Sequence, residues 1–360
     1  MAMGQQEDRR GDLMVGWAEM ARSAGHVFYD RLQSVLIEGG FDGFAEATCK
    51  PYYATRLGAP SVPPGRYFRM HLVGYFEGIN SERGLEWRCS ASLWLREFLR
   101  LESRDRVPDH SWLSKTRTRL PHEVHVAVFD WVLALIAEAG LVKGDRIGVD
   151  ASTMEANAAL RNIVRRDPGE GYREMLEHLA RESGIETPTA VDPAECVADK
   201  GYHSRAVLKA LDNSPWKTRI SEPKQNGFSR WRGDEAARRA VTNNRVHLKS
   251  GVAREAFKLR AEIVERSFAH NLDRRGMRRT WLRGRENVHR RYLLHVTGHN
   301  LSLLMRQLIG AGTPREAVAG GYGCIFVLMT PTGAVLVAQI LLIVSEDGKT
   351  AFAALCFVVG

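Results

Sequence analysis

The chain has 360 residues, which is enough for two domains with separate hydrophobic cores. Hydrophobic residues make up 44% of it, a proportion typical of globular proteins and too high for a disordered chain. Its five cysteines are odd in number and widely spaced, and no two of them form a C-x-x-C pair. Neither a disulfide framework nor a cysteine zinc site is indicated, so we expect a cytoplasmic protein.

The formal net charge is +9, and the whole basic excess lies between Pro215 and Arg291. That stretch holds 21 Lys and Arg against 8 Asp and Glu, which leaves the remainder of the chain acidic. Such a local excess indicates a polyanionic partner, because each neutralised phosphate releases counterions. The alternative interpretation is a solvated, arginine-rich face that binds nothing specific.

Residues 1–145 are predicted to form a mainly helical domain. Apolar residues recur at near-helical spacing from Leu85 to Leu101, and Pro121 is expected to open a second amphipathic helix. Between these helices, residues 107–120 predict a short helix capped by Asp109 or Ser111. A basic helix beside another helix suggests a helix-turn-helix that binds DNA. The residues expected to face the DNA are Lys115, Arg117 and Arg119.

The middle of the chain predicts an α/β arrangement. Short apolar runs at 145–150 and 194–198 indicate strands, and a mixed-charge helix is expected at 170–183. Residues 253–272 carry a single apolar stripe at helical spacing, and a last core helix is expected from Tyr292 to Leu308.

The end of the chain differs in kind. From Ala317 to Ser345 there is no charged residue, a length and composition that satisfy the crude test for a membrane span. Pro331, Gly333 and Gln339 interrupt this segment, so we favour a hairpin or a poorly specified appendage over a membrane helix.

Three acidic residues suggest a metal-dependent phosphodiester site. Asp150 and Asp199 each follow a predicted buried strand, and Glu265 lies beside the apolar stripe of the basic helix. Carboxylates at rigid strand ends can hold two Mg²⁺ or Mn²⁺ ions, which supply an activated water and stabilise the leaving oxygen. Glu262 is the alternative third ligand.

Each acid also has a purely structural interpretation. An aspartate after a strand is commonly a helix cap or a turn former. A glutamate next to an arginine in a helix is commonly part of a surface ion pair. The three acids together, in this order and within this positive charge, favour the metal site.

Four segments resemble the DDE class of bacterial insertion-sequence transposases. They begin at Gly148, Ile163, Val197 and Val264 and read GVDASTMEAN, IVRRD, VADKGYH and VERSFAH. The resemblance implies a helical domain at 1–145, a ribonuclease-H-like catalytic domain at 146–315, and an unassigned apolar tail at 316–360. It also implies magnesium at Asp150, Asp199 and Glu265, cleavage at the element ends, and strand transfer of the freed 3′-hydroxyl into target DNA.

The expected partners are DNA ends and target DNA, bound by a homodimer near the nucleoid, with no small-molecule substrate and no membrane. Further basic residues are expected to contact DNA beside the acids. They are Arg266, Arg274, Arg275, Arg278, Arg279 and Arg283. His270, Tyr202 and His203 also lie in the matching segments, where they either position DNA or pack the surrounding structure.

The chain departs from the family between the first two acids. Only 48 residues separate Asp150 from Asp199, and no alternating β-rich run occurs among them, although a ribonuclease-H-like sheet places a hairpin there. Strands two and three are therefore predicted to be deleted, leaving the first strand as an exposed edge. Ala261 and Leu272 also replace basic residues that are common in the family.

Several functional hypotheses follow. The first is a transposase, either active or inactivated by the deletion. The second is a non-catalytic DNA-binding remnant. A plain metal-dependent nuclease would use the same acids without strand transfer. A membrane-associated basic protein is suggested by residues 317–345 alone.

Overall fold

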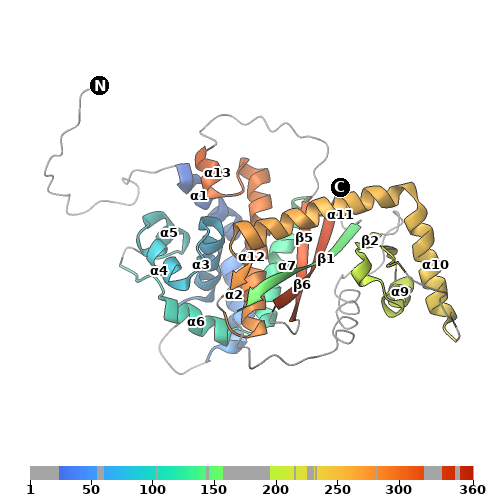
Figure 1. The fold of residues 1–360 in the computed structure, drawn as a ribbon. Coiled ribbons are helices and arrows are strands. Elements are labelled where there is room, and N and C mark those ends of the chain that lie inside the picture. The colour runs from blue at the N-terminus through green and yellow to red at the C-terminus, as the bar shows by residue number, and fades with distance from the viewer. Residues whose placement is uncertain are drawn as a thin grey trace.

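The fold was analysed in a computed structural model, and it is mainly helical with one six-stranded sheet (Figure 1). The structure describes residues 24–54, 61–102, 104–142, 146–156, 195–214, 216–224, 231, 233–280, 282–319, 335–344 and 349–359. In the last two ranges and for most of residues 146–156, the description is of the backbone. The α/β class with a helical N-terminal region is confirmed, while the helix expected at 170–183 lies outside the described residues.

The N-terminal region consists of helices whose starts are set by local capping. Ser81, Ser92 and Asp109 each accept a hydrogen bond from the backbone N–H three residues further on. The helices are α1 (Ala24–Glu38), α2 (Phe41–Cys49), α3 (Pro64–Glu77), α4 (Glu82–Ser90), α5 (Leu93–Phe98), α6 (His110–Arg119) and α7 (His122–Glu138), with a 3-10 turn η2 (Lys50–Tyr52).

One continuous hydrophobic core joins this region to helices from the second half of the chain. Helix α12 (Arg285–Ile309) lies against α7 and α3, and all residues from Arg290 to Leu301 are buried. Gly298 permits this close approach, because a Cβ at this position would meet Cγ of Tyr75 at 2.5 Å. The predicted helical and catalytic regions therefore share a core across residue 145.

The sheet has the strand order β3-β2-β1-β6-β5, with β4 pairing with the far end of β1. Strands β2 and β3 run parallel to β1, whereas β6 is antiparallel to β1 and to β5. The strands are β1 (Arg146–Ala156), β2 (Glu195–Ala198), β3 (Lys217–Ile220), β4 (Arg279–Thr280), β5 (Val335–Val344) and β6 (Lys349–Val359).

The expectation that the first strand is an exposed edge is wrong. Strand β1 pairs with β2 on one side and with β6 on the other, over ten residue pairs from Arg146↔Val358 to Glu155↔Lys349. The expectation of a hairpin or an appendage concerned residues 317–345, of which the structure describes 317–319 and 335–344; the second of these ranges is β5, which pairs antiparallel with β6. Among the described residues, no single helix is long and apolar enough to cross a membrane; only α6 and α7 together, bent by 97°, pass that test.

A second, smaller core lies under β2 and β3, where α9 (Arg205–Asp212) and α10 (Glu235–Lys249) pack. The remaining elements are the short turn η4 (Lys200–Tyr202), helix α11 (Gly251–Phe268), its π-helical continuation η5 (Ala269–Arg274), and α13 (Pro314–Ala319). Helix α11 connects the two cores, since it packs on β1 and β2 and contributes Ile263, Val264 and Phe268 to the larger core.

Candidate active site

The sheet register brings the two predicted aspartates to neighbouring positions. Strands β1 and β2 are parallel, and their last residue pair is Val149↔Ala198. The residue that follows Val149 in β1 is Asp150, and the residue that follows Ala198, directly after β2, is Asp199. Adjacent strands lie about 4.8 Å apart, so the backbones of the two acids come close although 48 residues separate them in sequence.

Asp199 is exposed at the end of β2, and its backbone is still extended at φ −74° and ψ 169°. Its Oδ1 accepts a hydrogen bond from the backbone N–H of Lys200 at 2.6 Å, which orients the carboxylate and opens the turn η4. Tyr202 is buried in the smaller core, so it packs this loop. His203 is half-buried, its Nε2 has no hydrogen-bond partner among the described residues, and burial lowers its pKa.

An ion-pair network fixes the opposite ends of these strands. Glu195 of β2 accepts hydrogen bonds from Arg146 of β1 at 2.9 Å and from Arg219 of β3 at 2.6 Å. Burial raises the pKa of Glu195, but the bonds from Arg219 and the charge of Arg146 outweigh it and hold that pKa below its ordinary value. The network joins three strands, and it therefore helps to hold the register that places the acids.

Helix α11 carries Glu265 and lies directly on β1. A Cβ at Gly148 would lie 3.1 Å from Cγ of Arg260 and 3.5 Å from Cγ2 of Val264, so glycine permits this approach. Gly148 precedes Asp150 by two residues, and residues two apart in a strand belong to the same face of the sheet. Glu265 follows Val264 and is exposed, and the helix thus brings it to the strand that carries Asp150.

The alternative ligand Glu262 is engaged elsewhere. Its Oε1 accepts a hydrogen bond from Arg266 Nη2 at 2.6 Å, an exposed pair one helical turn apart. Arg266 is 77% exposed, which leaves the guanidinium accessible to a ligand. Surface pairs of this kind contribute about 0.3–0.5 kcal/mol, so a phosphate could displace the glutamate at low cost.

His270 and Arg275 connect the end of α11 to α3 of the helical region. The Tyr75 hydroxyl lies 2.9 Å from Nε2 of His270, and Arg275 donates to the Tyr75 carbonyl at 2.8 Å while lying over its ring. Burial and the charge of Arg275 lower the pKa of His270 to about 4. These two side chains therefore hold the helical region against the helix that carries Glu265.

The other predicted DNA-contacting residues of this segment differ in exposure. Arg274, Arg279 and Arg283 are exposed, whereas Arg278 is half-buried and makes an ion pair with Asp273 at 2.8 Å. Strand β4 pairs Arg279 with Glu155 near the end of β1. This basic segment therefore lies beside the far end of β1, five residues and roughly 16 Å from Asp150.

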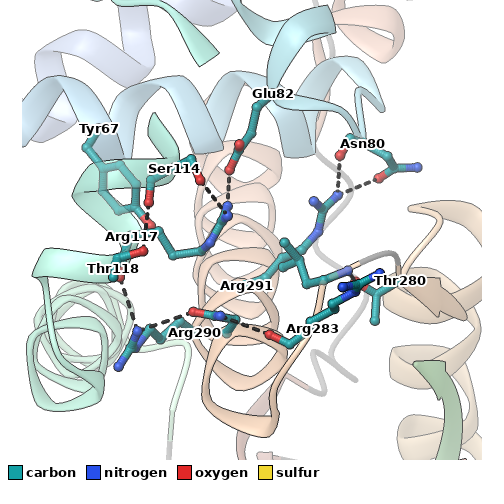
Figure 2. A network of polar contacts seen from close by, with 12 residues as sticks. Tyr67, Asn80, Glu82, Ser114, Arg117, Thr118, Thr280, Arg283, Arg290 and Arg291 are labelled. Atoms are coloured by element: carbon teal, nitrogen blue, oxygen red, sulfur yellow. Dashed lines mark hydrogen bonds and ion pairs between the residues drawn. The ribbon is translucent and has the colours of Figure 1, made fainter. Parts of the chain in front are cut away.

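On α6 the three predicted residues also separate into two kinds. Lys115 and Arg119 are exposed, and Arg119 lies over the ring of Tyr53. Arg117 instead points into the contact between α6 and α4, where it forms an ion pair with Glu82 (Figure 2). Its carbonyl accepts a hydrogen bond from Arg290 of α12 at 3.1 Å, so α6 is held by two helices.

Within the described residues, no group of three or more His, Cys, Asp or Glu side chains is placed to hold a metal ion. The Asp150 side chain lies outside that description. Two neighbouring aspartates and a glutamate are all-oxygen donors, the kind that Mg²⁺ and Mn²⁺ prefer. The donor set fits a hard divalent cation.

Comparison with known families gives two matches. Residues 18–119 match a transposase domain, and residues 225–305 match a transposase DDE domain that includes Glu265 and starts after both aspartates. Searches of curated proteins and of solved structures find no significant match.

Together the two matched domains define a DNA-transposition protein. The chain belongs to the DDE-type transposases of insertion sequences. Its partner is accordingly DNA, and a DDE domain implies dependence on divalent metal ions.

Sequence reasoning missed three residues that arrange this site. Gly148 opens one of the matching segments, but its role depends on the helix that lies against it. Glu195 has a detectable signal, since an acidic residue opens a strand that is otherwise apolar. Tyr75 offers no local signal, because its partner His270 lies 195 residues away.

Proposed function

We propose that this transposase cleaves the phosphodiester bond at each end of its element and joins the freed 3′-hydroxyl to target DNA. The observation that carries the proposal is the β1–β2 register, which ends on Val149↔Ala198 and so continues to Asp150 and Asp199. The contact of α11 with β1 at Gly148 adds the helix that carries Glu265 to the same place.

In this proposal Asp150, Asp199 and Glu265 hold two Mg²⁺ ions, or two Mn²⁺ ions. When bound, such ions lower the pKa of a water and stabilise charge on the leaving oxygen. The hydrogen bond that Asp199 accepts from the Lys200 N–H fixes the orientation of its carboxylate. The three carboxylates would hold these ions, and the ions in turn would position the phosphate; small displacements of reacting groups cost large factors in rate.

DNA would be held by the exposed basic residues around the acids. Arg266 lies one residue beyond Glu265, Arg279 pairs with Glu155 near the end of β1, and Arg283 follows β4 by three residues. A path of roughly 16 Å along β1 spans more than one phosphate of a DNA strand. Because two element ends must be joined, we propose that the protein acts as a homodimer on DNA in the cytoplasm.

The test is cleavage of a supercoiled plasmid that carries the ends of the chain's own element, with Mg²⁺ or Mn²⁺. Asp150→Ala and Glu265→Ala are compared with the unaltered protein, and Glu262→Ala is the matched control on the same helix. We expect both site variants to lose cleavage by at least 1000-fold, and Glu262→Ala to retain it.

The same reactions distinguish the competing functions. Cleavage without joining of the 3′-hydroxyl would identify a metal-dependent nuclease. Loss of cleavage in Glu262→Ala but not in Glu265→Ala would overturn the assignment of the third ligand. DNA binding without cleavage by the unaltered protein would identify a non-catalytic DNA-binding remnant, as a deletion between Asp150 and Asp199 would produce.

A further inference from the structure

The C-terminal hairpin occupies the position next to the strand that carries the first catalytic acid. Strand β6 is antiparallel to β1 over ten residue pairs, and Asp150 pairs with Ala354. Strand β5 pairs with β6 over ten residues on its other side. Both strands lie beyond residue 315, outside the two matched transposase domains.

We propose that strands β5 and β6 replace the missing edge hairpin of the catalytic sheet and hold the Asp150 strand in position. The sequence predicts a sheet that lacks two strands between Asp150 and Asp199. In the structure the neighbour of β1 on that side comes instead from the end of the chain (Figure 1). The pairing itself is independent of the proposed function, and only the expected effect on DNA cleavage rests on that function.

The extent of each pairing shows why β6 matters most at the acid. Strand β2 pairs with β1 over residues 146–149, and β4 pairs with residues 155–156. Among the described strands, β6 alone pairs with residues 150–154. Without β6, no described strand would pair with this stretch, which carries Asp150.

The hairpin also reaches the helices that cover the sheet. Helix α11, which carries Glu265, packs on β6 and β5 as well as on β1 and β2, and α12 lies against β5. The hairpin is thus in contact with the strand of one catalytic acid and with the helix of another. A rigid support of this kind is what a catalytic carboxylate needs to keep its position.

The composition of the tail suits this place in the sheet. Strand β6 is central, with β1 on one side and β5 on the other, and helices cover the sheet. A covered central strand reads as a near-continuous hydrophobic run. Strand β6 fits this rule, since only Lys349, at its first position, is charged. The edge strand β5, Val335–Val344, has no charged residue either and packs against α11 and α12.

The first experiment perturbs β6 in the full-length chain. Ala353, which pairs with Ala151, is replaced by proline, and Ala353→Val is the control because valine favours strands. Every N–H of a central strand faces one of its two neighbours, so proline breaks the ladder. We expect the amides of residues 150–154 to exchange with deuterium at least 10-fold faster in the proline variant only, and cleavage to fall by at least 10-fold.

The second experiment tests the register of β6 on β1 with substitutions smaller than a proline, which leave the backbone N–H groups in place. Ala151→Cys combined with Ala353→Cys should form a disulfide under mild oxidation, in a chain with Cys356→Ser. Ala151→Cys with Ala354→Cys is the control, since neighbouring strand residues belong to opposite faces. Equal cross-linking of both pairs, or of neither, overturns the proposed pairing.

These outcomes separate the hairpin from the catalytic proposal. Exchange and cross-linking report pairing even if the unaltered protein cleaves no DNA. In that case the proposed function fails while the hairpin assignment stands. Unchanged exchange at residues 150–154 in Ala353→Pro overturns the inference, and so does faster exchange with undiminished cleavage.

Discussion

Replacing Arg117 by alanine should destabilise the fold rather than simply weaken DNA binding. The Arg117 and Glu82 side chains are only 11% and 16% exposed, and Figure 2 shows the guanidinium between α6 and α4. Its Nη2 also donates to the Ser114 hydroxyl at 3.2 Å. The change removes one charge of a largely buried pair and leaves the other without its partner.

Breaking a buried ion pair costs about 3–5 kcal/mol. Because both side chains keep a small exposed fraction, we expect the lower end, about 3 kcal/mol. For a chain of this size, about 2 °C of melting temperature is lost per kcal/mol, so the midpoint should fall by roughly 6 °C. Differential scanning calorimetry of Arg117→Ala and of the double variant with Glu82→Leu measures this, and the double variant should recover part of the loss.

Lys115→Ala is the matched control on the same helix. Lys115 is exposed, so its removal should leave the melting temperature within about 1 °C. If it contacts a phosphate, the slope of log K against log salt falls by about 0.9 in a fluorescence titration with DNA. An unchanged melting temperature for Arg117→Ala, together with a reduced salt slope, would refute this reasoning and assign Arg117 to DNA.

Three further predictions concern helices α6 and α12. Asp109→Ala should lower the free energy of unfolding by about 1 kcal/mol through loss of the α6 cap, whereas Ser111→Ala should be nearly neutral in urea titrations. Gly298→Ala should cost about 1–3 kcal/mol in the same titration, because its Cβ would overlap Tyr75. Burial, with the positive groups nearby, lowers the pKa of His299 to about 3, below its unfolded value of about 6.5. The folded state therefore disfavours protonation of His299. Its contribution to the free energy of unfolding is fully present above pH 6.5, and up to about 4 kcal/mol of it is lost as pH falls towards 3. In thermal melts, the melting temperature of His299→Asn should fall less on acidification than that of the unaltered protein.

Local signals in the sequence predicted the helices and strands whose boundaries depend on nearby residues. Asp109 caps α6 as expected, and Pro121 stands immediately before α7. The apolar run from Leu85 to Leu101 contains two helices, because Ser92 caps a new helix by accepting the N–H of Leu95. A capping serine is visible in the sequence, but apolar spacing alone does not reveal the break.

The roles of individual basic residues were harder to predict, because charge does not specify a partner. Arg117 and Arg275 were both expected to contact DNA, yet the structure gives them Glu82 and the backbone of Tyr75 as partners. Each of these partners is far away in sequence. A basic composition predicts a positive surface, but only packing decides which guanidinium groups remain on it.

The arrangement of the acids was predictable in part. The apolar runs predict that Asp150 and Asp199 each follow a strand, which is right for Asp199 and wrong for Asp150, because β1 continues to Ala156. What places the two acids together is the parallel β1–β2 pairing, which stops beside both of them. The helix that carries Glu265 was recognised from its stripe, although its last turn continues as the π-helix Ala269–Arg274. The contact at Gly148, which brings that helix to β1, depends on tertiary packing.

The tail shows why composition alone left two interpretations open. A membrane helix and a strand of a sheet that is covered by helices both favour uncharged apolar residues. They differ in length, because a spanning helix needs about 20 residues and a strand needs far fewer. Val335–Val344 has ten residues and pairs throughout with β6. Strands that are neighbours in a sheet can be far apart in the chain. The 48 residues between the aspartates supply no predicted hairpin to pair with β1, and a strand from the C-terminal part of the chain can take that place.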